Sequence, residues 1–315
     1  MTHIAIDLFD EATGTNWSPT KMRFRVSASQ LKMFHPGAGG CPRKWAMHYL
    51  AHVPRLPGQA LTDGIRLHEC IAQRFQLSPD AWAKRWPTFW QPGLSLEQQQ
   101  IVKTAQLAVA MIDQTPAGNM PPISESTDML DVPELDTAFY IKPDLHRDRS
   151  IFVDWKSTSA VSKKSEWVLQ DPAWYAGATM IRADVKFLKD DIQARLYAHG
   201  LMTMWHEVKI RARWVYGSKK FEPGDRPKVW IVEHTFERAE TRDWVEKNIW
   251  PTVRTMNTIR AAWDAKRLDS PLLVPHVGES CGFTGRFCDA LGQCGFQPSP
   301  IPLGKLALPV LPGTH

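Results

Sequence analysis

The sequence contains no apolar run that approaches the roughly 20 residues needed to cross a membrane. Its N-terminal residues also lack the charged-then-apolar layout of a secretory signal peptide. Only five of the 315 residues are cysteine. In a reducing compartment, so few cysteines argue against a disulfide framework and leave metal binding or core packing as their roles. We therefore expect a cytoplasmic protein that does not associate with membranes.

The sequence also has no large excess of positive or negative residues, since 38 basic and 33 acidic residues give a formal net charge of +5. This mild excess is compatible with a polyanionic partner but does not require one. A hydrophobic content of 43% over 315 residues is enough for a sizeable buried core. The fourteen tryptophans are unusually many. Most should lie in the core, and some could stack on unpaired bases.

Residues 139–159 form the most informative segment, in which two apolar stretches, FYI and IFV, flank a polar turn. This pattern predicts two adjacent strands with a short connection. Alternation along the second strand predicts two different faces. The apolar face is formed by Ile151, Val153 and Trp155, and the face with two charges by Phe152, Asp154 and Lys156. Asp144, just after the first strand, could bring a second carboxylate to the same place.

Two carboxylates and a lysine are the groups needed to hydrolyse a phosphodiester with a divalent metal. Asp144 and Asp154 can hold Mg²⁺, which prefers oxygen ligands and lowers the pKa of a bound water. Lys156 can orient the attacking water or stabilise the developing negative charge. The alternative is a surface Asp–Lys pair with no catalytic role.

The N-terminal third of the chain is expected to be helical. Ser27 or Ser29 can cap a short helix that runs to Phe34, and a second helix is expected over residues 42–51. A third helix, over residues 61–75, has an apolar stripe formed by Leu61, Ile65, His68, Ala72 and Phe75. A lone histidine on such a stripe is more often a satisfied core residue than a ligand.

The remaining elements alternate between helices and strands. Helices are expected over residues 96–113, from near Ser165, over 190–205 and over 237–266, and strands over 208–216 and 228–236. In the helix over 190–205, Gln193 and Tyr197 are four residues apart and therefore share one face. The strand over 208–216 alternates apolar and basic residues, and we expect its basic face to be solvated.

Three of the cysteines, Cys281, Cys288 and Cys294, lie close together among glycines near the C-terminus. This is a metal-binding composition rather than a packing one. Cys41 lies far upstream, where a buried apolar role is the alternative to ligation. Cys70 has no matching partner in the sequence and is not expected to be a ligand. Four thiolates suit zinc as well as iron.

Several of these motifs together resemble the PD-(D/E)XK nuclease superfamily. Pro143-Asp144 followed by Asp154-Trp155-Lys156 resembles its signature, and IFVDWKSTS is similar to the RecB-type branch, with its CRISPR-associated exonucleases. Further matches follow in the order of the family: SASQLKMF and CPRKW near the N-terminus, Gly64 with His68, Gln193 with Tyr197, and the late cysteines. The resemblance covers roughly residues 26–296, and the late cysteines are more widely spaced than is usual in the family.

The resemblance implies a restriction-endonuclease-like α/β fold, in which helices flank a mixed β-sheet core. It implies a Mg²⁺ or Mn²⁺ site with His68, Asp144, Asp154 and the backbone carbonyl of Trp155 as ligands, and Lys156 as a further catalytic residue. It implies DNA contacts for Gln193, Tyr197 and Arg195. One [4Fe–4S] cluster joining the two ends of the chain is implied for Cys41, Cys281, Cys288 and Cys294, with a structural Zn²⁺ as the alternative.

The function implied is metal-dependent DNA hydrolysis by an exonuclease, in recombination, repair or CRISPR-type DNA processing. The alternatives are a structure-selective or single-strand endonuclease, and a DNA-binding or assembly protein without nuclease activity. No G-x-x-x-x-G-K-[ST] loop is present, so a helicase, like a recombinase or a CRISPR adaptation protein, would be a separate partner. The expected compartment is the cytoplasm of a prokaryotic cell, or of the host if a phage encodes the protein.

Five segments are expected along the chain. They are an N-terminal extension (1–25), a helical region with Cys41 and His68 (26–130), the nuclease core (131–266), a cysteine-rich segment (267–297) and a Pro-rich tail (298–315).

Overall fold

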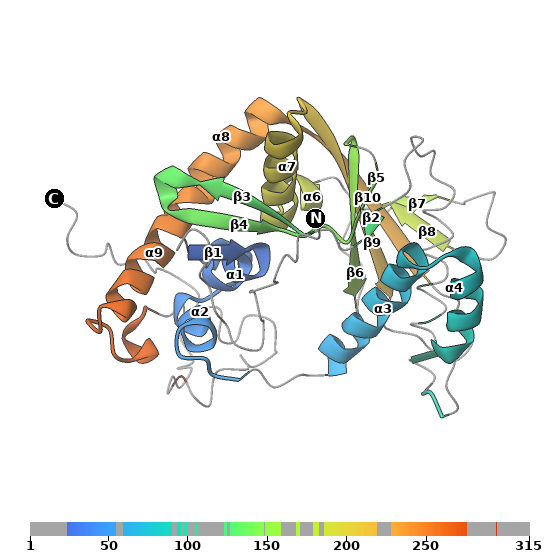
Figure 1. Ribbon diagram of the computed structural model, residues 1–315, viewed down its shortest axis with the longest axis horizontal. Coiled ribbons are helices and arrows are strands. Elements are labelled where there is room, and N and C mark those ends of the chain that lie inside the picture. The colour runs from blue at the N-terminus through green and yellow to red at the C-terminus, as the bar shows by residue number, and fades with distance from the viewer. Residues whose placement is uncertain are drawn as a thin grey trace, which may run out of the picture.

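Helices flank two mixed β-sheets in the computed structural model of the protein (Figure 1). The residues that it describes are 24–54, 59–89, 93–95, 98–99, 102, 105, 123–124, 127–147, 149–158, 168–170, 179–182, 186–218, 228–275 and 294. One sheet has the strand order β1-β4-β3 and the other the order β2-β5-β6-β9-β10-β8-β7. The expectation of a mixed α/β fold is therefore confirmed, whereas a cysteine-ligated cluster is not seen in the described ranges.

The small sheet brings the start of the described chain beside its middle. Strand β1 (Phe24–Ser27) runs parallel to β4 (Thr137–Ile141), and β3 (Asp128–Val132) runs antiparallel to β4. Ser27 ends β1 and caps helix α1 (Ala28–Phe34), because its Oγ accepts a hydrogen bond from the backbone N–H of Gln30 at 3.2 Å. The capping and end predicted for this helix are confirmed.

A glycine-rich turn folds the chain back against the end of α1. After a 3₁₀ turn (Pro36–Ala38), Gly39 adopts a left-handed φ of 75°. A Cβ on Gly40 would lie 2.4 Å from the backbone oxygen of Lys32, so a larger residue does not fit there. The backbone N–H of Cys41 then donates to the oxygen of Met33 at 2.6 Å, and helix α2 (Pro42–Tyr49) begins. The second predicted helix is confirmed, two residues shorter.

Strand β6 (Ile151–Thr158) lies inside the large sheet, between β5 (Leu145–Arg147) and β9 (Lys209–Ser218). It is antiparallel to β5 and parallel to β9, which pairs with β10 (Lys228–Glu237) as an antiparallel ladder. The other strands of this sheet are β2 (Ile123–Ser124), β7 (Val168–Gln170) and β8 (Thr179–Arg182). The strands predicted over residues 208–216 and 228–236 are confirmed.

The expected pairing of the FYI and IFV stretches is wrong. FYI belongs to β4 in the small sheet, and the hairpin partner of β6 is instead the short strand β5. The chain leaves one sheet after Ile141 and enters the other at Leu145, so the segment between them joins the two sheets. Asp144 lies in this segment.

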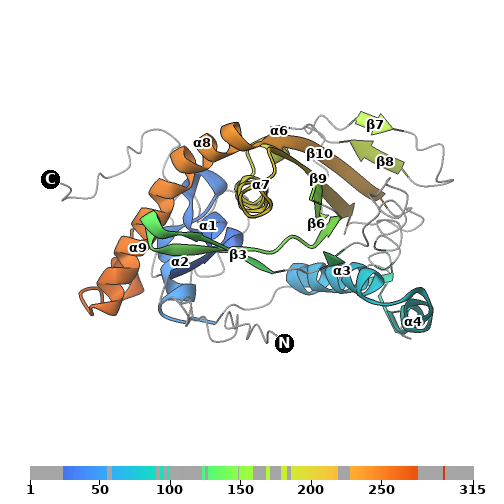
Figure 2. The same ribbon diagram turned by 45° about the horizontal axis from the view of Figure 1, so that its top comes forward.

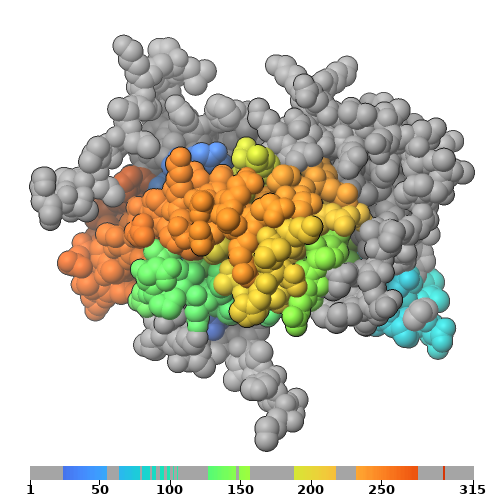
Figure 3. Space-filling view, turned by 90° about the horizontal axis from the view of Figure 1, so that it is seen from above, coloured from blue at the N-terminus to red at the C-terminus, as the bar shows by residue number. Residues whose placement is uncertain are grey.

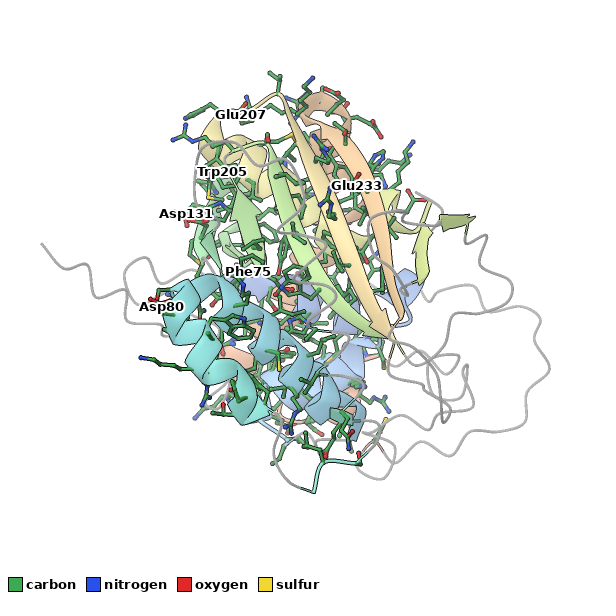
Figure 4. The ribbon with its side chains drawn as sticks, turned by 90° about the vertical axis from the view of Figure 1, so that its right-hand side faces the viewer. Phe75, Asp80, Asp131, Trp205, Glu207 and Glu233 are labelled. Carbon is green, nitrogen blue, oxygen red and sulfur yellow. The ribbon has the colours of Figure 1, made fainter. Side chains whose placement is uncertain are left out.

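Helices cover both faces of β6. Helix α3 (Gln59–Gln76) lies over one face, where the ring of Phe75 stacks on Trp155 with centroids 6.3 Å apart (Figure 4). Helix α7 (Ile192–Trp205) lies over the other, where Tyr197 meets Phe152 edge to face at 6.2 Å. Both predicted faces of β6 are therefore buried, and the charged face points at α7.

The buried stripe of α3 overlaps the predicted one only in part. The buried residues are Leu67, Cys70, Ile71 and Ala72, whereas Ile65 is 58% exposed. Ala72 is therefore buried as predicted and Phe75 faces β6, but Leu67, Cys70 and Ile71 replace Ile65 on the buried side. Cys70 packs in the core as a small apolar residue.

Two helices, α8 (Arg238–Asn248) and α9 (Trp250–Asp264), replace the single helix predicted over 237–266. Pro251 lies in the first turn of the second one, where its missing N–H is tolerated. Figure 3 shows α8 and α9 beside β3 and β4 on one face of the molecule, and Figure 2 shows α7 between α8 and the strands. Helix α8 packs on α7.

The shorter elements complete the description. They are α4 (Pro79–Arg85), α6 (Lys186–Lys189) and 3₁₀ turns at Trp86–Phe89, Pro133–Leu135 and Pro271–Leu273. Of the helix predicted over 96–113, only residues 98–99, 102 and 105 are described, and all are helical. The helix start predicted near Ser165 lies outside the described residues, and residues 168–170 are a strand. Among the described helices, none combines the length and apolarity that a membrane span needs.

Candidate functional site

Asp144 is held at the edge of β6 by the backbone of the strand itself. Its Oδ2 accepts a hydrogen bond from the backbone N–H of Trp155 at 2.7 Å. The Nδ1 of His68, from α3, lies 3.5 Å from the same oxygen. The connection between the sheets and the helix over β6 thus meet at one carboxylate.

Asp154 and Lys156 project together from β6 towards the first turn of α7. The Lys156 ammonium contacts Oδ1 of Asp154 as an ion pair. The side chain of Gln193 bridges the two charges, since its Nε2 donates to Oδ2 of Asp154 at 2.6 Å and its Oε1 accepts from Lys156 at 3.0 Å. The sheet and α7 therefore fix both charged groups through one amide.

The environment separates the pKa values of the two carboxyl groups. Burial, reinforced by the negative charge of Asp144, raises the pKa of Asp154 to about 7 despite the nearby Lys156 ammonium. Burial acts in the same direction on Asp144. The hydrogen bond and charge of His68, followed by the charge of Lys156, outweigh it there and leave the pKa of Asp144 lowered. Near neutral pH, Asp144 is the more fully ionised of the two.

The two cationic groups are held in their charged forms. Burial alone would lower the pKa of Lys156, but the charges of Asp154 and Asp144 outweigh burial and raise it. The pKa of His68 is likewise raised, because its hydrogen bond to Asp144 and the charge of that carboxylate exceed the effect of burial. Two acids and two bases thus form one electrostatic unit.

Of the three residues expected to contact DNA, the structure brings Gln193 and Tyr197 to this unit. Tyr197 is buried, and hydrogen bonds to the side chain of Gln193 and the backbone of Lys142 act against the rise in its pKa that burial causes. As placed, Tyr197 supports Gln193 rather than presenting a ring to a base.

Arg195 is not brought to this site. Its side chain is 1% exposed, its Nε donates to the backbone oxygen of Lys189 at 2.6 Å, and its Nη2 donates to Glu240 at 3.0 Å. The guanidinium also lies over the rings of Phe236 and Trp244. The expected phosphate contact by Arg195 is therefore corrected to a packing role between α7, β10 and α8.

Two of the four expected cluster cysteines can be placed. Cys41 is buried at the start of α2, and Cys294 packs against Met47 of the same helix. Cys281 and Cys288 lie outside the described residues. Cys294 therefore lies against the helix that Cys41 precedes, and the presence and identity of any metal there stay a prediction.

The residues around Asp144 and Asp154 can be compared with the needs of a divalent metal. Within the described residues, no three His, Cys, Asp or Glu side chains converge closely enough to hold an ion, so His68 does not complete a ready three-ligand group. Oδ1 of Asp154 is buried and lacks a hydrogen bond to any described residue, although Lys156 contacts it. The buried carboxylate of Asp154 with this oxygen, beside the carboxylate of Asp144, fits Mg²⁺ or Mn²⁺ in chemistry.

Sequence patterns missed two residues of this network, Lys32 and Asp191. The Nζ of Lys32, from α1, lies 2.7 Å from Oδ2 of Asp191 and 3.4 Å from Oε1 of Gln193. Asp191 caps α7 through its Oδ1, which accepts from the backbone N–H of Ala194 at 2.9 Å. The position of Asp191 before an apolar helix was a usable signal, whereas nothing in the sequence around Lys32 pointed to α7.

Comparisons with known proteins address the fold. No protein-family model matches the sequence, and no curated protein matches it. The crystal structure of the Eubacterium rectale protein named "Putative exonuclease" is similar over 96% of this chain and 97% of its own, with a TM-score of 0.52 and 14% identity. The structure of SSO0001 matches 71% of this chain and 75% of its own at a TM-score of 0.28 and 12% identity, too low to support an argument. The chain thus shares its overall fold with the Eubacterium rectale protein.

Proposed function

We propose that the protein is a metal-dependent nuclease that hydrolyses phosphodiester bonds in DNA from an end. The observation that carries this proposal is the convergence of Asp144, Asp154, Lys156 and Gln193 in one buried network where the sheet meets α7. Paired acids whose pKa values are driven apart beside a lysine are typical of catalytic centres rather than of surface ion pairs. The name of the Eubacterium rectale protein supports the choice of an exonuclease over an endonuclease.

In this proposal Asp144, Asp154 and the backbone carbonyl of Trp155 hold Mg²⁺ or Mn²⁺. When bound, such an ion lowers the pKa of water and offsets charge on the phosphate. Metal binding would favour the ionised form of Asp154 in particular, because burial and the charge of Asp144 disfavour that form when no ion is bound. His68 contacts Asp144 and positions that carboxylate.

Lys156 acts on the reacting groups themselves. An ammonium that stays protonated can donate to the attacking water or to a phosphate oxygen as negative charge develops. Gln193 sets its direction, because the same amide is bonded to Lys156 and to Asp154. Tyr197 packs one helical turn along α7 and holds Gln193 in place.

We also propose a second, structural metal centre made by the cysteines. Cys294 packs against the helix that Cys41 precedes, which supports an arrangement with thiolates from two segments distant in the sequence. Four thiolates match the ligand count of one [4Fe–4S] cluster or of one Zn²⁺. In this proposal the centre ties the chain ends together and takes no part in hydrolysis.

The test of the nuclease proposal is an assay on end-labelled single-stranded, end-labelled double-stranded and closed circular DNA. We expect cleavage of linear DNA with Mg²⁺ or Mn²⁺, none with EDTA, and none of closed circles. Asp154→Ala and Lys156→Ala should each lower the rate by about a hundredfold or more. Asp243→Ala and Lys247→Ala, on the exposed side of α8, are matched controls that should leave the rate unchanged.

Three outcomes would contradict this proposal. Full activity in Asp154→Ala would place the chemistry elsewhere. Cutting of closed circles would make the protein an endonuclease. Tight DNA binding without cleavage in either metal would favour the DNA-binding alternative.

A further inference from the structure

Helix α1 reaches the proposed nuclease centre through the side chain of Lys32. Its ammonium lies 2.7 Å from Oδ2 of Asp191 and 3.4 Å from Oε1 of Gln193. The side chains of Lys32 and Asp191 are 33% and 23% exposed, so the pair is partly shielded from water. The segment that carries Lys32 is distant in sequence from β6 and α7, which form the rest of the network.

Asp191 has two tasks that use different oxygens. Its Oδ1 caps α7 by accepting from the backbone N–H of Ala194, while its Oδ2 takes the ammonium of Lys32. The negative charge of Asp191 also acts on Lys156 and favours its charged form. Asp191 therefore acts on Lys156 together with Asp144 and Asp154. The carboxylate of Asp191 is itself paired with Lys32.

The amide of Gln193 is held by charge on both of its ends. Its oxygen faces two ammonium groups, Lys156 at 3.0 Å and Lys32 at 3.4 Å, and its nitrogen faces Asp154 at 2.6 Å. Loss of Lys32 would remove one of the two donors that face the oxygen. It would also leave Asp191 without its cation, next to the ammonium on which the proposed chemistry depends.

We propose that Lys32 is a positioning residue of the nuclease centre. It occupies Asp191 and supports the amide of Gln193, so that Lys156 remains directed at Asp154. This inference rests on the proposed function for its effect on rate, but its structural content does not. Helix α1 is thereby part of the proposed nuclease centre, although it supplies no group to the reacting atoms.

The test is a double-mutant cycle between Lys32 and Asp191. Lys32→Met keeps the length and apolar stem of the side chain and removes its charge. Asp191→Asn removes the competing charge while keeping a good helix cap. If Lys32 acts by occupying Asp191, Lys32→Met should lower kcat on DNA about tenfold with KM changed less than threefold, and Asp191→Asn should restore most of the lost rate.

Two further variants control the cycle. Lys32→Arg should keep more than a third of the wild-type kcat, since a guanidinium can still pair with Asp191. Lys247→Met removes the same charge from an exposed position of α8 and should leave kcat and KM unchanged. The melting temperature of Lys32→Met should stay within a few degrees of wild type, which separates loss of position from loss of fold.

A crystal structure of Lys32→Met gives a readout that does not depend on activity. We expect the Lys156 ammonium to turn towards Asp191 and its bond to Gln193 to be lost. An unmoved Lys156 overturns the inference even if the protein proves to have no nuclease activity. So does an unchanged kcat, a rise in KM alone, or a double variant no faster than Lys32→Met. An inactive wild-type protein whose Lys156 moves in the variant overturns the proposed function but not the positioning role.

Discussion

Replacement of Asp154 by Asn should make the protein more stable at neutral pH, which is unusual for a buried network. The change keeps the shape of the side chain and an oxygen for Nε2 of Gln193, but removes the charge. The pKa of Asp154 rises from 3.8 in the unfolded chain to about 7 in the folded one, mainly through burial and then through Asp144. Between those values the folded state binds more protons than the unfolded state, so the contribution of this group to stability falls as pH rises. Asn imitates the protonated form that the fold prefers.

The size of the effect follows from the same shift. About three pKa units at roughly 1.4 kcal/mol each set a ceiling of about 4 kcal/mol for the cost of ionising Asp154 in the fold. Asn cannot pair with Lys156 as a carboxylate does, so we expect about half of that ceiling, or roughly 2 kcal/mol at pH 8. For a chain of 315 residues, with an unfolding entropy of about 2.1 cal/mol/K per residue, that corresponds to a rise in melting temperature of about 3 °C.

The measurement is thermal and urea unfolding of wild type and Asp154→Asn at pH 5, 6, 7 and 8 in EDTA. The advantage of Asn should grow from pH 5 to pH 7 and then level off. Addition of Mg²⁺ should stabilise the wild type and not the variant, because a ligand that binds only the folded state adds its binding free energy. Asp243→Asn, at an exposed position of α8, is the control and should show no pH-dependent difference. A variant less stable than wild type at pH 8 would refute the reasoning.

Three other predictions concern neighbouring parts of the structure. The pKa of His68 is raised in the fold, so its charged pair with Asp144 stabilises the folded state at low pH, and this contribution is lost as pH rises through that pKa. His68→Ala should therefore lower the unfolding free energy more at pH 6 than at pH 8.5. Equal losses at the two pH values would contradict the charged pair. Protein purified without oxygen should be brown and hold about four irons per chain. Cys41→Ser should lose the colour, and Cys70→Ser should keep it. One zinc per chain, or no metal, would rule the iron–sulfur cluster out. Arg195→Met should lower the unfolding free energy by about 3 kcal/mol, measured with urea, and leave DNA affinity unchanged. Weaker DNA binding at unchanged stability would show instead that Arg195 contacts DNA.

Local patterns in the sequence identified much of strand β6 but not its surroundings. Alternation along Ile151–Thr158 correctly placed Asp154 and Lys156 together, because period two is a property of the strand itself. The same reasoning paired FYI with IFV and failed. Which strand lies beside β6 depends on how two sheets divide the chain after Ile141, and neither stretch carries that information.

Residues that join the site from distant elements were the hardest to foresee. Lys32 lies in a helix whose cap and length were predictable, yet its contact with Asp191 exists only because β1 pairs with β4 and brings α1 against α7. Arg195 shows the opposite error. A basic residue between Gln193 and Tyr197 suggested a phosphate contact, but its position on the helix turns it to α8 and the core.

The path of the chain also sets the order in which the molecule can be finished during synthesis. Strand β1 and helix α1 are synthesised well before the partner of the strand, β4, and before Asp191, the partner of Lys32. The contacts of helix α2 are completed later still, because the side chain and backbone N–H of Arg43 donate to the backbone oxygens of Val274 and Pro275. Contacts between such distant segments form slowly and late. A nascent chain that has not yet reached α7 therefore lacks Asp191 and Gln193, and the network around Asp154 and Lys156 is incomplete in it.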